Sequence, residues 1–146
     1  MDSNLSSGQW HVSLHFTTDQ FDEQTLQWRD CEVRHVAATA QQLAAPFPAK
    51  FDQFVDSINE MSGGYAEGDG SYGVVGPGGA WKICGNVFEN LDAIQYAELL
   101  GSCPVDQLRQ FVALLGCSSE QCLFQNLQGG FFQTFDQFVG EQPKPS

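Results

Sequence analysis

Lysine and arginine are scarce in this chain. Its 146 residues contain 6 Lys and Arg against 18 Asp and Glu, which gives a formal net charge of -12. A chain this negative repels nucleic-acid phosphates and anionic membrane surfaces. We therefore expect no direct nucleic-acid binding and no membrane binding. If charge selects a partner, that partner is a basic protein, another cation or a metal ion.

Long apolar runs are missing too. No segment approaches the ~20 apolar residues that a membrane-spanning helix needs. Residues 1–7 lack the positive charge and the apolar stretch of a secretory signal. Five cysteines, an odd number, fit reduced thiols in a cytosol better than a disulfide framework. We expect a cytoplasmic protein with no bound cofactor, and its oligomeric state stays open.

What the chain does contain suits one α+β domain. Its residues are 42% hydrophobic and 12% aromatic, enough to fill a core. We predict a single domain over residues 1–140 and a flexible tail at 141–146. Within the domain we expect a small antiparallel sheet, built from an N-terminal meander and from hairpins within 71–100. Two main amphipathic helices at 49–61 and 104–115 would pack against it, and short C-terminal helices would complete the core.

The stretch from Ala80 to Gly116 gives this expectation its clearest support. Alternation over 80–88 predicts a half-buried strand, and turn-forming residues follow it before a second strand over 93–100. A helix over 91–100 is the alternative. Pro104 then starts a helix whose apolar residues recur at three- and four-residue steps, and the glycine at 116 stops it.

The two ends of the chain are predicted to flank this centre. Alternating residues over 9–17 predict the first strand, and residues 26–36 a second strand that pairs with it. Short helices are expected over 118–127 and 131–139, because a serine can cap the first and a Gly-Gly pair separates the two.

Two patterns resemble motifs but have plainer interpretations. Gly68-Asp69-Gly70-Ser71-Tyr72-Gly73 satisfies G-x-G-x-x-G, yet it follows a predicted helix rather than a strand. We therefore expect a hairpin turn there and no dinucleotide site. Phe51-Asp52-Gln53-Phe54-Val55 recurs as Phe135-Asp136-Gln137-Phe138-Val139. No fixed period surrounds the two copies, so we interpret them as a coincidence of similar amphipathic helices.

The histidines and cysteines are weak candidates for metal or thiol chemistry. His11 and His15 share a strand face, but at that spacing they lie ~13 Å apart, too far for one ion, and we expect both at the surface. Cys103, just ahead of a predicted helix, would meet the positive end of the helix dipole, which favours a thiolate. A hypothetical zinc site would combine four residues whose spacings match no strong zinc signature: Cys31, His35, Cys117 and Cys122.

The most informative pattern is a row of carboxylates. Asp52, Asp56 and Glu60 recur at four-residue steps on the polar face of the predicted helix at 49–61, where each adjacent pair costs ~0.2–0.5 kcal/mol. Glu67 and Asp69 follow, and no Lys or Arg occurs between residues 51 and 81. A solvated acidic face is the plain interpretation. The functional interpretation is a negative surface that docks a basic partner.

Three functions from different classes follow from these patterns. The first is a small acidic binding protein, of inhibitor or immunity type, whose five carboxylates hold a basic protein. The second is a thiol or zinc enzyme that uses Cys103 or the four-residue zinc set. The third is a self-associating module in which the strand at 9–17, as an exposed edge, pairs with a second copy. We favour the first, which is not an enzyme.

Overall fold

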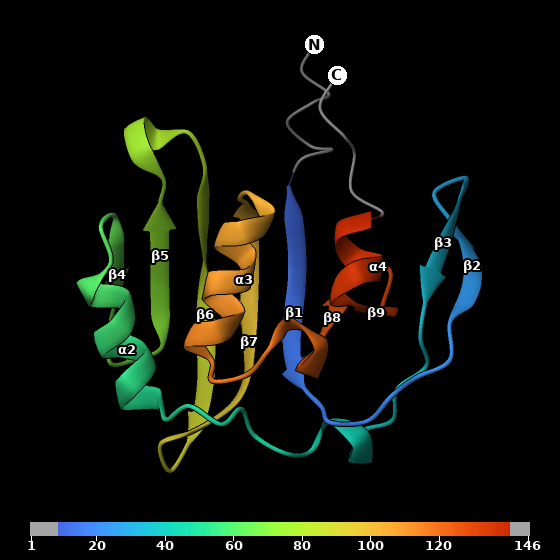
Figure 1. Ribbon diagram of the computed structural model, residues 1–146, viewed down its shortest axis with the longest axis horizontal. Coiled ribbons are helices and arrows are strands. Elements are labelled where there is room, and N and C mark those ends of the chain that lie inside the picture. Colours follow the sequence, from blue (N-terminus) through green and yellow to red (C-terminus); the bar gives the residue numbers. More distant parts are fainter. Residues whose placement is uncertain (1–8, 141–146) are drawn as a thin grey trace.

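A computed structural model describes residues 9–140 of the chain (Figure 1). It contains a seven-stranded antiparallel sheet in the order β4-β5-β6-β7-β1-β8-β9, and a two-stranded sheet that pairs β2 with β3. The strands are β1 (Trp10–Phe16), β2 (Gln24–Trp28), β3 (Cys31–His35), β4 (Gly64–Ala66), β5 (Ser71–Val75), β6 (Lys82–Asn90), β7 (Ala93–Ser102), β8 (Cys122–Asn126) and β9 (Phe132–Thr134). The helices are α2 (Phe51–Glu60), α3 (Val105–Leu114) and α4 (Phe135–Gly140), with short 3-10 turns η1 (Gln41–Leu43), η2 (Pro77–Gly79) and η3 (Ser119–Gln121).

Helices and an antiparallel sheet in one chain confirm the α+β class, although the sheet is larger than the small one predicted. None of the helices within residues 9–140 has the length and apolar character needed to span a bilayer. The tail expected at 141–146 lies outside the described residues, and the extent of the domain stays a prediction.

All three α-helices lie on the same face of the large sheet (Figure 1). Phe54 of α2 and Phe111 of α3 both contact the Tyr72 ring of β5, with ring centroids 5.9 and 5.1 Å away. Phe138 of α4 stacks on Phe124 of β8 at 4.7 Å. The core therefore lies between the helices and one face of the sheet. The other face, which no helix of the described chain covers, is called the open face below.

The central hairpin of the prediction is confirmed. Strands β6 and β7 pair in antiparallel register, so the alternative helix over 91–100 is wrong. Their turn consists of Leu91 and Asp92, both with positive φ (55° and 69°). The carbonyl of Asp92 accepts from the Phe51 N–H (2.9 Å), and its carboxylate accepts from the Asp52 N–H (3.1 Å). The turn thus caps the start of α2, and the predicted helices at 49–61 and 104–115 are present as α2 and α3.

The prediction of an N-terminal meander, in which residues 9–17 pair with residues 26–36, is wrong. Arg29 and Asp30 both have positive φ (51° and 62°), so the predicted strand over 26–36 is instead the tight β2–β3 hairpin, which forms its own sheet. Strand β1 pairs with β7 on one side and β8 on the other. It lies inside the sheet, so residues 9–17 are not the exposed edge strand that the self-association hypothesis assumed. The edge strands are β4 and β9, each of three residues, short as edges that resist pairing usually are.

The prediction of two C-terminal helices, over 118–127 and 131–139, is wrong in part. Residues 122–126 form β8, with Leu14 of β1 opposite Phe124, so only η3 is helical in the segment predicted as a helix over 118–127. The segment 131–139 divides into the end strand β9 and helix α4. The alternating pattern over β8 spans only five residues, so helix-like spacing led to a helix prediction. In the structure these residues form a strand because they pair with β1.

The repeated segment begins a helix in the same way both times. In α2 the side-chain oxygen of Gln53 accepts from the Lys50 N–H at 3.1 Å, and in α4 that of Gln137 accepts from the Thr134 N–H at 3.1 Å. Each glutamine satisfies a backbone N–H at the helix start, as the third helical residue does in a capping box. The recurrence therefore has a shared local cause. The G-x-G-x-x-G segment forms the β4–β5 hairpin turn, as predicted.

Candidate binding surface on the open face

Large apolar side chains gather on the open face of the sheet. Strand alternation directs Val12 and Leu14 of β1 into the core, and it directs the odd-numbered β1 residues to the open face. Seven large hydrophobic residues are exposed within the described chain, and five of them occupy open-face positions. These five are Tyr65, Val75, Phe88, Tyr96 and Leu100. Several exposed apolar side chains on one face are typical of an interaction surface, whereas single exposed apolar residues are ordinary.

A row of rings crosses this face near the β6–β7 turn. His15 stacks on Tyr96 with centroids 5.7 Å apart, and Tyr96 stacks on Phe88 at 4.5 Å. On its other side, His15 meets the edge of Phe132 at 5.8 Å, and its Nε2 lies 2.8 Å from the Ser13 Oγ. Burial lowers the pKa of His15 from 6.5 to about 4. The expectation of a surface residue is wrong for His15, because its neighbours remove much of the imidazole from water.

The open face is hollowed where the pairing of β6 with β7 is interrupted. Register pairs run from Lys82 to Cys84 and resume at Val87, and within the described chain Gly85 and Asn86 have no partner on β7. A Cβ added at position 85 would lie 2.0 Å from the Glu98 carbonyl oxygen, so the close approach requires glycine. From the core side, the Tyr72 hydroxyl donates to that carbonyl at 2.9 Å. We call this interruption the β6–β7 gap.

A pocket of about 340 Å³ opens at the β6–β7 gap. It combines an aromatic and an aliphatic wall with several polar groups. Its open-face lining comprises Tyr65, Ser71, Cys84, Asn86, Glu98 and Leu100. The ring of Tyr65 lies over Gly73, where a Cβ would approach it to 2.5 Å. No residue of the described chain forms a hydrogen bond or an ion pair with the Glu98 carboxylate, which leaves this charge available to a ligand.

The structure divides the five predicted site residues between two places. All five are exposed. Asp69 borders the pocket, because its carboxylate accepts from the N–H (3.0 Å) and the hydroxyl (2.7 Å) of Ser71, a lining residue. These hydrogen bonds lower the pKa of Asp69. Glu67 belongs to the same turn, whereas the remaining three lie on α2, in the helix layer: Asp52, Asp56 and Glu60.

Sequence reasoning missed Glu98, the carboxylate inside the pocket. A usable signal was present, since Tyr96, Glu98 and Leu100 alternate along one predicted strand and so share a face. It missed Asp92 for a different reason. That side chain lies 40 residues from Asp52 in sequence, and the fold places it at the start of α2.

The cysteines do not support the thiol or zinc hypothesis. Burial, together with the charge of Asp106, raises the pKa of Cys103 to about 12, which disfavours the thiolate on which the thiol-enzyme hypothesis depends. Burial also raises the pKa of Cys117 to about 12. Over residues 9–140 no three His, Cys, Asp or Glu side chains come together as metal ligands, so Cys31, His35, Cys117 and Cys122 do not assemble a site. All five cysteines are free thiols.

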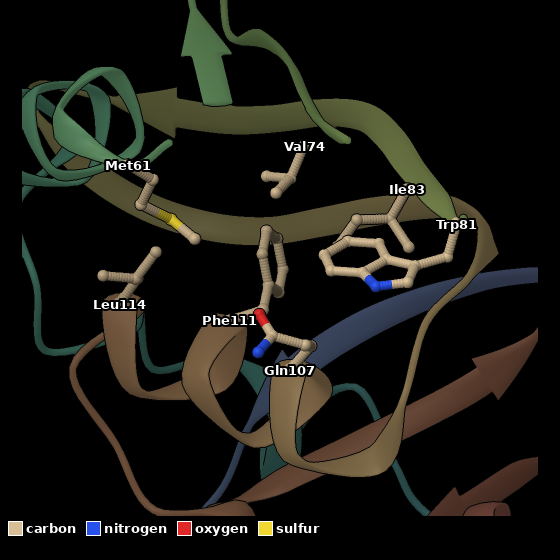
Figure 2. A pocket seen from close by; sticks show the side chains of 7 residues that line it. All are labelled: Met61, Val74, Trp81, Ile83, Gln107, Phe111 and Leu114. Carbon is tan, nitrogen blue, oxygen red and sulfur yellow. The ribbon is translucent and has the colours of Figure 1, made fainter. Parts of the chain in front are cut away.

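Two other hollows lie near α3. Figure 2 shows the smaller, where Met61 and Leu114 face Trp81 across Phe111. Its volume of about 10 Å³ holds at most one water molecule, and no charged side chain lines it. An adjoining open hollow of about 640 Å³ is lined largely by glycine and proline loops, with Asp106 as a charged group. Neither joins exposed aromatic residues to several polar groups as the β6–β7 gap does.

Comparison of this chain with protein-family models, with curated proteins and with solved structures finds no match. The geometry of the open face and the distribution of charge are therefore the basis of the functional argument.

Proposed function

We propose that this protein is a small, non-enzymatic binding protein that docks a basic protein partner, in an inhibitor or immunity-type role. The observation that carries the proposal is the gathering of exposed apolar side chains on the open face, next to the unpaired carboxylate of Glu98. Exposed aromatic residues such as Phe88 and Tyr96 supply the desolvated centre that binding energy requires. The Glu98 carboxylate in the pocket and the Asp69 carboxylate at its border set the sign of the partner's charge at this face.

The five predicted carboxylates act mainly on the rate of association. Asp52, Asp56 and Glu60 are exposed along α2, and Glu67 and Asp69 occupy the β4–β5 turn. The three on α2 lie in the helix layer, across the sheet from the open face (Figure 1), so they act at longer range than the two in the turn. Charges outside the buried centre of an interface steer a partner of opposite sign and contribute less to the final affinity. The net charge of -12 extends this attraction beyond the contact surface, within a Debye length of ~8 Å at physiological salt.

A basic partner is favoured over a second copy of the chain. Two copies meeting through their open faces would each bring a net charge of -12 to the contact. Like charges opposed across an interface are unfavourable. The free state of all five thiols supports a reducing compartment, so we also propose a cytoplasmic location.

The proposal is tested with a panel of small basic proteins and arginine-rich peptides, measured by surface plasmon resonance. The first variant reverses the predicted carboxylates: Asp52→Lys, Asp56→Lys, Glu60→Lys, Glu67→Lys and Asp69→Lys. We expect the association rate of this variant to be lower than that of the wild type by roughly tenfold or more. We also expect the association rate of the wild type to fall as the salt concentration is raised from about 50 to about 300 mM.

A second variant separates docking from general attraction between opposite charges. Phe88→Ser combined with Tyr96→Ser leaves the net charge unchanged and should raise the dissociation rate by roughly tenfold. The matched control Glu32→Lys changes an exposed charge in the β2–β3 hairpin and should alter both rates far less. Binding that ignores salt and charge reversal, or no binding across the panel, would remove the proposal.

A further inference from the structure

The pocket at the β6–β7 gap matches the chemistry of one long basic side chain. We propose that it receives the guanidinium or ammonium group of an arginine or lysine of the partner, an assignment that rests on the proposed function. Its charged end would meet the Glu98 carboxylate, while its aliphatic stem would pack between Tyr65 and Leu100. This makes the pocket the anchor point of the docking surface.

The size of the pocket favours a single side chain. Its volume of about 340 Å³ is at the lower end of small-molecule sites, which run from roughly 300 to 1,000 Å³. The pocket is also open to solvent along the sheet, so a group tethered to a protein surface can enter it from above. Arginine and lysine bury their stems on apolar walls and keep their charge at a polar end.

The polar groups of the pocket fit a cation. Glu98 supplies a carboxylate with no hydrogen-bond or ion-pair partner in the described chain, and Asn86 and Ser71 supply further acceptor oxygens. The Tyr65 ring offers its face to a cation, which an aromatic ring attracts. Asp69 adds a second negative charge at the rim through its hydrogen bonds to Ser71. An anionic ligand would be repelled by both carboxylates.

Lys82, the basic residue of β6, does not fill this role. Lys82 of β6 occupies an open-face position two residues before Cys84, and its side chain is exposed. Among the described residues, the ion pairs do not include Lys82 with Glu98. Within residues 9–140 the charge of Glu98 is thus left without a basic partner, as the proposed cation requires.

Cys84 provides a probe of the pocket that requires no change in its lining. It lines the pocket and is half-buried, while Cys31 is exposed elsewhere. Burial raises the pKa of Cys103 and Cys117 to about 12, and Cys122 is buried. Because the thiolate is the reactive form, a Cys31→Ser protein should be alkylated first at Cys84 near neutral pH.

The experiment measures alkylation of Cys84 by N-ethylmaleimide in Cys31→Ser protein, with and without an arginine-rich peptide. A peptide of the same length with citrulline in place of arginine keeps the shape and removes the charge. We expect the arginine peptide to slow alkylation by roughly fivefold or more and the citrulline peptide to have little effect. Glu98→Gln should weaken binding of the arginine peptide by roughly tenfold, as loss of a charged hydrogen-bond partner does.

The matched control is Glu32→Gln, which removes one exposed carboxylate from the β2–β3 hairpin. It should weaken peptide binding much less than Glu98→Gln, and thermal unfolding of both variants verifies that they are folded. Two outcomes overturn the pocket assignment and leave the proposed function standing. One is equal peptide binding by wild type and Glu98→Gln, and the other is a rate of Cys84 alkylation by N-ethylmaleimide that bound peptide does not change. Peptide that binds none of the proteins contradicts both the assignment and the proposed function.

Discussion

Protonation of His15 should destabilise the folded protein, because this ring is held among aromatic neighbours. Its pKa falls from 6.5 to about 4 through burial. The unfolded chain therefore binds a proton on His15 at a higher pH than the folded protein does. Stability from the neutral ring is fully present above pH 6.5, decreases as the pH falls from 6.5 towards 4, and decreases no further below 4.

The size of this effect follows from the two pKa values. Each pH unit between them contributes about 1.4 kcal/mol, so the free energy of unfolding should fall by at most about 3 kcal/mol between pH 7 and pH 4. Over the same range the carboxylates begin to gain protons, which changes stability independently of His15. The wild-type profile alone therefore does not isolate the ring.

A comparison with His15→Gln isolates it. The free energy of unfolding is measured by urea titration at half-unit steps from pH 7 to pH 4 for both proteins, with His11→Gln as the control at an exposed position of the same strand face. The difference between wild type and His15→Gln should shrink by up to about 3 kcal/mol towards pH 4. If the unfolding free energies of wild type and His15→Gln change with pH in parallel, the burial of His15 is not the cause of the loss of stability at low pH.

Two further predictions concern the helix starts and the central turn. Gln137→Ala should lower the free energy of unfolding by about 2 kcal/mol, because Gln137 is buried and its side chain also donates to the Glu23 carboxylate and the His35 carbonyl. Gln53→Ala, at an exposed helix start, should lower it by only about 0.5 kcal/mol. Equal losses of unfolding free energy for the two variants, measured by chemical denaturation, would contradict the larger contribution assigned to Gln137. Leu91→Asn should raise stability by about 1 kcal/mol, because Leu91 has φ 55° in a tight turn and is 92% exposed. A lower thermal midpoint for Leu91→Asn would contradict the strain assigned to this turn.

Local signals predicted the elements that depend on nearby residues. The turn between β6 and β7 and the helix after Pro104 were both predicted, since alternation, turn formers and helix stops act within a few positions. The β2–β3 turn was not, because Arg29-Asp30 lacks the Asn-Gly or Asp-Gly pair that usually marks two positive φ angles. There, cross-strand pairing and the contact of the Arg29 guanidinium with the Trp28 ring, 4.4 Å from its centroid, accompany the turn.

Elements that depend on distant pairing were beyond such signals. Strand β8 follows a helix-like spacing, yet it pairs with β1 from the opposite end of the chain. The start of α2 has Lys50, a poor capping residue, and relies on Asp92 from the turn of another hairpin. For the site, the exposure of the carboxylate row was predictable from amphipathic spacing. The β6–β7 gap was not, because it exists only between two strands already in register.

Several departures from regular structure lie in the hairpin that carries the proposed site. The β6–β7 pairing is interrupted at Gly85, its register shifts between Phe88 and Glu89, and its turn holds an exposed leucine at positive φ. A continuous ladder closed by Asn-Gly would satisfy local preferences better. Sequences keep such conflicts mainly where function requires them. Because the interruption forms the pocket and Phe88 belongs to the aromatic row, the proposed binding at the open face would account for both the hairpin's irregularities and its exposed surface.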